Sequence, residues 1–155
     1  MEWKVKDFDD FTAREWYAVT QVRESVYIVE QERIYPELDG VDLEAKHLLG
    51  IDGDGKIATY ARIYETEHGV SFGRVLVSPD FRGKGLSKQL VAHILQVIAR
   101  DYPDKDIVID AQEYIQRLYA SFGFEAISGV HEHIGTPHVT MRLAAADNPE
   151  IVNAR

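Results

Sequence analysis

The chain has 155 residues, 45% of them hydrophobic and 28% charged, which fits one globular domain with a sizeable core. Its formal net charge of −9 opposes binding to nucleic acid or to an anionic membrane. Cysteine is absent, which excludes disulfides, thiol catalysis and cysteine-based metal sites. No signal-peptide segment or membrane-spanning apolar run is visible, so a cytoplasmic location is expected.

The N-terminal part predicts a strand, a helix and a loop. Residues 3–5 alternate apolar and basic side chains, as in a short strand. Thr12 and Glu15 have the spacing of a capping box, which opens a helix. Residues 27–31 either extend this helix or form an extended segment, and both alternatives fit. Proline, glycine and carboxylates at 34–42 predict a loop.

A hairpin and a third strand are predicted next. His47–Ile51 is a short apolar strand, and residues 56–65 form its partner. The Asp-Gly-Asp-Gly run at 52–55 between them is typical of a hairpin turn. A second turn at 67–69 leads into the apolar strand Phe72–Val77.

The chain is organised around the basic, glycine-rich turn Pro79–Gly85 and the amphipathic helix that follows it. The apolar stripe of that helix consists of Leu86, Leu90, Val91, Ile94, Leu95 and Ile98. The glycines permit a close backbone approach to a ligand, and free amides at a helix start favour an anion. Arg82, Lys84 and Lys88 add positive charge. The pattern predicts a phosphate-binding turn or, alternatively, an ordinary solvated turn, since the P-loop and dinucleotide-binding patterns are absent.

The C-terminal third predicts the remaining elements of the sheet. They are a buried strand at 107–109, a helix at 114–122, strands at 124–130 and 138–143 paired around a loop at 135–137, and a mobile tail at 147–155. The order β-α-β-β-β-α-β-α-β-β predicts an α/β fold in one domain, residues 1–146. Its mixed, mainly antiparallel sheet of about six to seven strands is flanked by helices.

The turn Arg82-x-x-Gly85-x-Ser87 resembles the pyrophosphate-binding turn of the GCN5-related N-acetyltransferase (GNAT) superfamily. Ser87 stands where that family usually has Gly or Ala. A wider set of residues is similar to the ElaA-like branch: Arg23, Val26–Gln31, Tyr35–Gly40, Asp42, His47–Leu48, Ala61–Arg62, Gly73–Val75, Arg82–Leu86, Ala111–Gln112, Pro137–His138 and Met141. His133–Thr136 depart from the branch, which tends to have an acidic pair and Gly-Ile before Pro137.

The resemblance implies a GNAT fold and acetyl transfer from acetyl-CoA to a primary amine of a small molecule or peptide, by direct attack in a ternary complex. The implied coenzyme A (CoA) contacts are Val75, Leu76, Val77, Arg82, Gly83, Lys84, Gly85, Leu86, Ser87, Lys88 and Gln112. The diphosphate is expected on the amides of the turn. Pantetheine is expected along residues 75–77 as an added pseudo-strand, in a groove opened by a β-bulge.

Two catalytic groups are expected. Tyr119, four residues before Gly123, stands where the family has the acid that protonates the thiolate; packing in its helix is the alternative. Glu30 is the first candidate for the base, because it closes the segment expected to line the acceptor pocket. The other candidates for the base are Asp42, His47 and His138.

The acidic residues and histidines leave further alternatives open. The carboxylates Glu30, Glu37, Asp39 and Asp42 either attract a cationic amine or form a solvated acidic loop. No metal site is expected from His131, His133 and His138, because no zinc-binding pattern is present. The rival functions are a non-catalytic CoA-binding sensor and an acyltransferase that uses longer chains. Nucleic acid and membrane partners are not expected, and a homodimer stays open.

Overall fold

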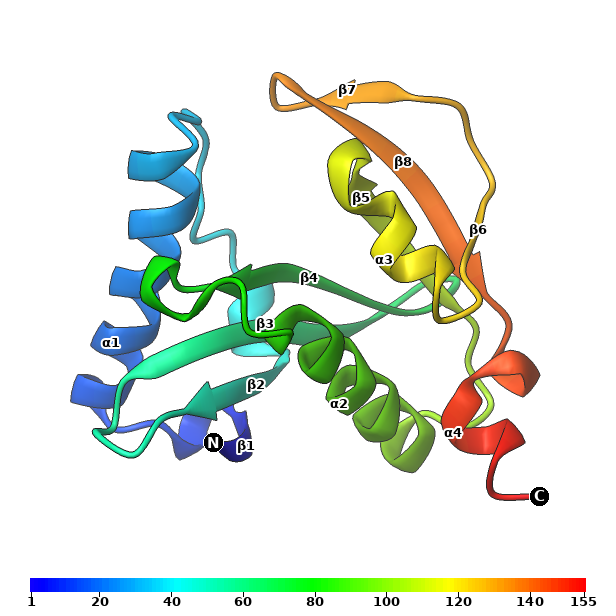
Figure 1. Cartoon of the computed structure of the whole chain (residues 1–155), viewed down its shortest axis with the longest axis horizontal. Coiled ribbons are helices and arrows are strands. Elements are labelled where there is room, and N and C mark those ends of the chain that lie inside the picture. The colour runs from blue at the N-terminus through cyan, green and yellow to red at the C-terminus, as the bar shows by residue number, and fades with distance from the viewer.

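A mixed β-sheet runs through the molecule, which a computed structural model describes over residues 1–155 (Figure 1). Its strand order is β1-β2-β3-β4-β5-β8-β6, and β7 pairs with β8. The strands are β1 Glu2–Asp7, β2 Lys46–Ile51, β3 Ile57–Thr66, β4 Gly69–Val77, β5 Ile107–Gln112, β6 Glu125–Ala126, β7 His131–His133 and β8 Thr136–Leu143. Only the β4–β5 pair is parallel. The α/β fold with a mixed, mainly antiparallel sheet is therefore confirmed.

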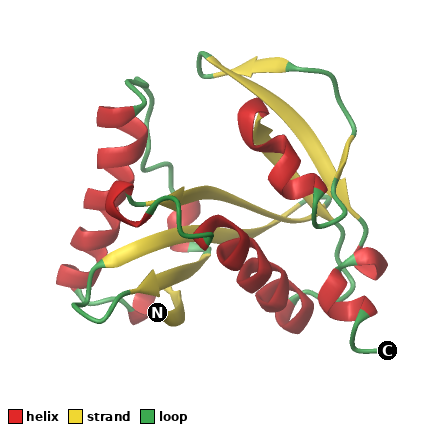
Figure 2. Ribbon diagram, viewed as in Figure 1, coloured by secondary structure: helices red, strands yellow, loops and turns green.

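Helices cover both faces of this sheet (Figure 2). They are α1 Ala13–Arg23, α2 Leu86–Asp101, α3 Gln116–Ala120 and α4 Pro149–Val152. Adjacent residues of a strand point to opposite faces, so Leu48 packs in the core under α2 and Leu49 in a smaller core under α1. The predicted apolar stripe of α2 is buried in full. None of the helices is both long and apolar enough to cross a membrane.

The first helix resolves the alternative left open for residues 27–31. Thr12 and Glu15 form the predicted capping box, with both reciprocal hydrogen bonds present. After α1 the chain continues without a break as a π-helical segment, Glu24–Glu30. π-helical turns are rare and often lie at functional sites. This segment buries Val26 and Tyr27 against the sheet.

The hairpin between β2 and β3 forms as predicted. The Asp52 carboxylate accepts hydrogen bonds from the amides of Asp54 (3.0 Å) and Lys56 (2.8 Å), which closes the turn. Gly55 adopts φ 80°, a left-handed conformation that favours glycine. The hairpin fixes the register of the two strands that lead to β4.

A β-bulge divides β4 into two halves. Tyr60 pairs with Leu76 and Arg62 with Gly73, so β4 has one residue more than β3 over this stretch, and Arg74 adopts φ 50°. As a result Phe72 faces the α2 core, whereas Leu76, four residues later, faces the α1 core. β4 and β5 share a single register pair, Val70 with Ile107, and separate beyond it.

The C-terminal elements differ from the prediction in two places. Within the expected strand 124–130 only β6 pairs, and a separate strand β7 forms before the last loop. The tail expected to be mobile contains α4, which packs on α2, and Asn148 is fully buried. The Asn148 side-chain amide donates to the Leu95 carbonyl (3.2 Å), and its oxygen accepts from the Glu150 amide (3.0 Å). A count of apolar residues does not detect this polar anchor.

Candidate active site

A cavity of about 730 Å³ lies where β4 and β5 separate. Residues 71–75 of β4 form one wall, and residues 108–112 of β5 form the opposite wall. Tyr27 and Tyr35 line the cavity from the side of α1, and Tyr119 lines it from α3. Because Tyr119 packs in the core under α2, the cavity extends through the sheet from one face to the other.

The glycine-rich turn presents open backbone at the start of α2. Gly83 and Gly85 adopt φ 78° and 75°, and nothing lies within 4 Å of a Cβ placed on either. Gly85 is the N-cap residue, and no side chain caps the helix. The first amides of α2 have no partner within the helix, so they are free to bind an anion. Leu86 is buried in the core, whereas the first-turn residues Ser87 and Lys88 are exposed.

Glu30, at the end of the π-helical segment, forms an ion pair with Arg82 of the glycine-rich turn. Both guanidinium Nη atoms of Arg82 donate to the Glu30 carboxylate at 2.7 Å, and its Nε donates to the Val77 carbonyl at 3.0 Å. The hydrogen bond from Arg82 lowers the pKa of Glu30. Glu30 does not line the cavity. The structure thus brings Glu30 to the glycine-rich turn and does not bring it to the expected acceptor pocket.

Tyr119 packs in the core and also lines the cavity, so packing is observed and the acid role stays a prediction. Its ring packs edge-on against Phe72 and Phe124, with centroid distances of 5.7 and 6.0 Å, and its exposed fraction is 3%. It also lines the cavity. Burial raises the pKa of the phenol above its ordinary value of 10.0, so the hydroxyl keeps its proton at neutral pH.

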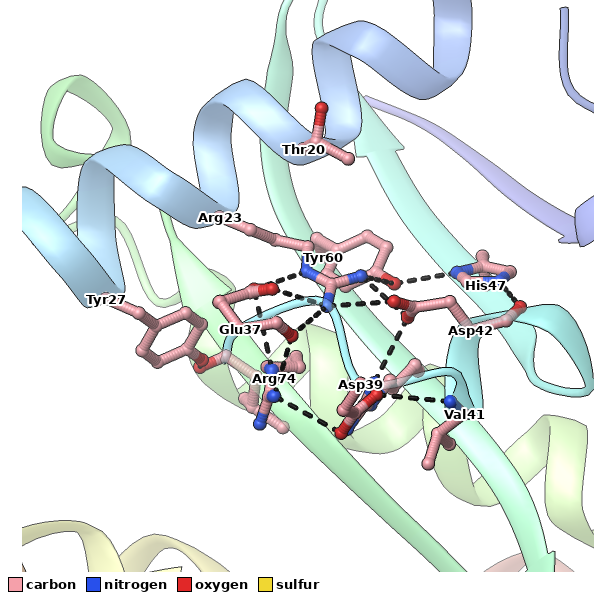
Figure 3. A network of polar contacts seen from close by, with 12 residues as sticks. Thr20, Arg23, Tyr27, Glu37, Asp39, Val41, Asp42, His47, Tyr60 and Arg74 are labelled. Carbon is pink, nitrogen blue, oxygen red and sulfur yellow. Dashed lines mark hydrogen bonds and ion pairs between the residues drawn. The ribbon is translucent and has the colours of Figure 1, made fainter. Parts of the chain in front are cut away.

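Three arginines and three carboxylates form an ion network beside the cavity (Figure 3). Arg23, which is fully buried, pairs with Glu37 and Asp42. Arg62 pairs with Asp39 and Asp42. Arg74, the residue of the β-bulge, pairs with Glu37 and Asp39. Arginines neutralise each of these carboxylates, so none of them is free to attract a cationic amine, although Asp39 stays partly exposed.

Two of the candidate bases are fully engaged inside the protein. The Asp42 carboxylate binds Arg23 and Arg62. His47 has Nε2 at 2.9 Å from the Asp42 carbonyl, so Nε2 donates, and Nδ1 accepts from the Tyr60 hydroxyl at 2.7 Å. Neither residue lines the cavity. Both hold the loop and sheet together.

His138 is the candidate base that the structure places in the cavity wall. Its Nδ1 lies 2.8 Å from the Thr136 carbonyl oxygen, which can only accept, so Nδ1 carries the hydrogen of the neutral ring. Nε2 is then an unprotonated acceptor without a partner in the chain. Burial lowers the pKa of His138 from 6.5, which keeps the ring neutral at physiological pH.

The remaining predicted contacts lie along the walls of the cavity or beyond them. Val75 lines the cavity, and its carbonyl accepts a 2.6 Å hydrogen bond from the Tyr27 hydroxyl. Gln112 also lines it, with its amide 3.5 Å from the Gln31 side-chain oxygen. Leu76 and Val77 continue β4 past the cavity toward the glycine-rich turn.

Sequence reasoning assigned no role to Tyr27, Arg33 or Tyr35, all of which line the cavity. The signal in the sequence that could have found them is their position: Tyr27 lies in residues 27–31, which the sequence leaves either helical or extended, and Arg33 and Tyr35 follow that segment. His131, His133 and His138 do not form a group that could hold a metal ion.

Comparisons with known proteins agree with this geometry. The family model of the acetyltransferase (GNAT) domain matches residues 14–145. The chain is 37% identical over 145 residues to a protein of Schizosaccharomyces pombe, covering 92% of this chain and 97% of that protein. It is 36% identical over 146 residues to Escherichia coli ElaA, covering 91% and 95%.

Solved structures show the same relationship. The crystal structure of an acyl-CoA N-acyltransferase from Pseudomonas aeruginosa has a TM-score of 0.87 at 35% identity, covering 93% of this chain and all of that one. The crystal structure of Escherichia coli ElaA has a TM-score of 0.85 at 35% identity, covering 91% and 97%. The chain therefore belongs to the GNAT acetyltransferases, in the branch that contains ElaA.

Proposed function

We propose that this protein is an acetyl-CoA-dependent N-acetyltransferase that acts on a primary amine of a small molecule or peptide. The observation that carries the proposal is the cavity between β4 and β5, together with the uncapped start of α2, the helix that follows β4 in the chain. Family membership supports acyl transfer. An aminoglycoside 6′-N-acetyltransferase crystallised with coenzyme A shares the fold, with a TM-score of 0.69 at 11% identity.

The glycine-rich turn fits a diphosphate. The amides of Lys84, Gly85, Ser87 and Lys88 surround the helix start, where the helix dipole favours negative charge. The space around both glycines is open, so a phosphate oxygen can approach the backbone closely. Arg82 stands at the entrance, already ordered by Glu30. These features support CoA binding at this turn.

The second half of β4 fits the pantetheine arm and the thioester. Beyond Val70 this strand has no strand partner on the β5 side, so an extended ligand can lie along that edge and bind backbone groups other than the Val75 carbonyl. Tyr27 already holds the Val75 carbonyl, which keeps the bulge in one conformation. An amide next to the bulge can donate to the thioester oxygen and stabilise the negative charge that develops on it.

His138 is the group that we assign as the base. A primary amine with a pKa of about 10 arrives as an ammonium and must lose a proton before it attacks. The unprotonated Nε2 of His138 can accept that proton, because the Thr136 carbonyl fixes the hydrogen on Nδ1. The low pKa of His138 also lets the ring return the proton to solvent.

Tyr119 is the group that we assign as the acid. Attack forms a C–N bond and, when the C–S bond breaks, the Tyr119 hydroxyl gives its proton to the sulfur. The nitrogen, now part of an amide, loses its extra proton, which restores the phenol. The raised pKa of Tyr119 ensures that the hydroxyl starts in its protonated form. The net change releases one proton per ammonium consumed.

A screen of primary amines with acetyl-CoA tests the proposal, with free thiol as the signal. The proposal expects thiol release that depends on the acceptor and a product heavier by one acetyl group. The alternative, a CoA-binding sensor, predicts CoA binding with no acceptor-dependent release. Longer acyl-CoA donors in the same screen separate an acetyltransferase from an acyltransferase that prefers longer chains.

A further inference from the structure

Arg33 is the one partly buried arginine of the chain that has no carboxylate partner. The other arginines without an ion pair, Arg14, Arg117 and Arg155, are exposed at the surface. The hydrogen bond of Arg33 to the protein is a single one, from Nη2 to the His133 carbonyl at 3.3 Å. Arg33 lines the cavity, so a guanidinium without a carboxylate partner forms part of the cavity wall.

Unpaired hydrogen-bond donors gather at this wall. Four buried side-chain atoms in the protein have no hydrogen-bond partner: Nε of Arg33, Arg62 and Arg74, and the hydroxyl of Tyr35. All four residues line the cavity. The guanidinium groups of Arg33 and Arg74 both lie against the Tyr35 ring, at 4.8 and 5.2 Å from its centroid. Buried donors normally have acceptors, so this cluster lacks an acceptor that a ligand can supply.

The unpaired guanidinium of Arg33 points to an anion. The lining contains three arginines and two aspartates. Asp39 is held by Arg62 through two 2.7 Å hydrogen bonds, and Asp110 accepts from Thr140 at 2.8 Å. Neither aspartate forms an ion pair with Arg33, which therefore has no carboxylate partner, although the whole chain has a net charge of −9. A bidentate carboxylate matches a guanidinium in this state.

The anion site lies close to the proposed base. His133, whose carbonyl accepts from Arg33, packs its ring edge-on against His138 with centroids 5.2 Å apart. An acceptor that presents an amine to His138 can therefore reach Arg33 with a second group. We propose that Arg33 and the Tyr35 hydroxyl bind the carboxylate of the acceptor, so that the acceptor is an amino acid or another amine that carries a carboxylate.

This inference rests on the proposed function, and matched acceptors test it. Glycine and the ω-amino acids up to 6-aminohexanoate are compared with the alkylamines and amino alcohols of the same length. The expected result is a kcat/KM at least about tenfold higher for one amino acid than for its uncharged analogues, a difference of about 1.4 kcal/mol. Equal use of alkylamines would overturn the carboxylate site while acetyl transfer itself stands.

Arg33→Gln is the variant that assigns the preference, and Arg14→Gln is its control. Both remove one arginine charge, but Arg14 is exposed on α1 and does not line the cavity. Arg33→Gln should reduce the preference to about threefold or less, and Arg14→Gln should keep it. A preference that survives in Arg33→Gln would overturn the inference. Arg33→Lys should restore part of the preference, which separates a lost charge from a disturbed fold.

Calorimetry with the CoA-loaded protein separates the two proposals if no amine releases thiol. Binding of an amino acid that is lost in Arg33→Gln and kept in Arg14→Gln would support the anion site, although acetyl transfer fails. Absence of amino-acid binding to the CoA-loaded wild-type protein would overturn the site.

Discussion

A single substitution can separate the packing of Tyr119 from its proposed role as the acid. Its ring packs with Phe72 and Phe124, and its residue lines the cavity. Replacement by phenylalanine keeps the ring and removes the proton donor. Tyr119→Phe should lower kcat about 10²-fold or more, the usual contribution of a general acid, with CoA affinity unchanged. Thiol-release kinetics and CoA calorimetry measure both; an unchanged kcat would remove Tyr119 from the mechanism.

If His138 is the base and Glu30 is not, replacing each residue should have a different effect on kcat. His138→Gln should lower kcat about 10²-fold. In the wild type, kcat should fall as His138 becomes protonated, at a pH below the ordinary histidine value of about 6.5, because burial lowers its pKa. Glu30→Gln should keep kcat, since its carboxylate holds Arg82 outside the cavity. Loss of kcat in Glu30→Gln with normal kcat in His138→Gln would reverse the assignment.

For single residues, the sequence predicts a role when that role depends only on neighbours in the chain. The position of Gly85 at the start of a helix could be predicted from the sequence, whereas the acid role of Tyr119 comes from the family resemblance and stays a prediction. The role of Arg33 could not be predicted, because it depends on which carboxylates the other arginines already bind. The engagement of Asp42 and His47 has the same origin, since their partners lie on β3 and α1.

The junction of β4 and β5 is the element on which the cavity depends. The two strands meet only near Val70 and Ile107, and Gly69 lies directly before that contact. A Cβ on Gly69 would lie 2.2 Å from the Asp106 carbonyl oxygen, and its φ of 147° disfavours other residues. The junction therefore requires glycine at position 69.

Gly69→Ala tests the junction, with Gly53→Ala as its control. The first substitution should lower the free energy of unfolding by about 2 kcal/mol or more, because backbone at the junction must shift. Gly53 has open space around it and no positive φ, so Gly53→Ala should change stability by less than about 0.5 kcal/mol. Urea titrations measure both. Similar stabilities for the two variants would show that the junction tolerates a wider approach.

Elements that depend on residues close together in the sequence were predictable. Features that depend on contacts between distant parts of the chain were not. The capping box, the Asp-Gly hairpin and the stripe of α2 each depend on residues close in sequence. The position of the bulge at Arg74 depends on how β3 pairs with β4, which no local pattern records. The docking of α4 depends on Asn148 reaching Leu95, 53 residues earlier.

For the whole molecule, the histidines link stability to pH. Burial lowers the pKa of His47, His93 and His138 from 6.5. The unfolded chain therefore binds more protons than the folded one just below pH 6.5, so stability present above that pH is lost as pH falls. The free energy of unfolding should decline from pH 7.5 to 5.5. Urea titrations in about 0.2 M salt, which screens the net charge, check this; equal or higher stability at pH 5.5 would contradict it.

The overall architecture followed from the order of elements and from the family resemblance, whereas the position and lining of the cavity required coordinates. The fold class and the family are confirmed. The charge of the cavity wall was not predictable, because the acidic loop was compatible both with attraction of a cation and with a solvated surface. Arginines from α1, β3 and β4 neutralise the carboxylates of this loop, which neither alternative included.

Calorimetric titration with coenzyme A is the most direct test of the proposed acetyl transfer, because every proposed step requires CoA at the start of α2. Gly85→Ala and Gly55→Ala place the same side chain at φ 75° and 80°, each with open space around it, but only Gly85 belongs to the proposed site. We expect the wild type and Gly55→Ala to bind CoA alike, and Gly85→Ala to bind it about tenfold more weakly, a loss of about 1.4 kcal/mol. A wild-type protein that does not bind CoA, or equal affinity in all three proteins, would contradict this expectation.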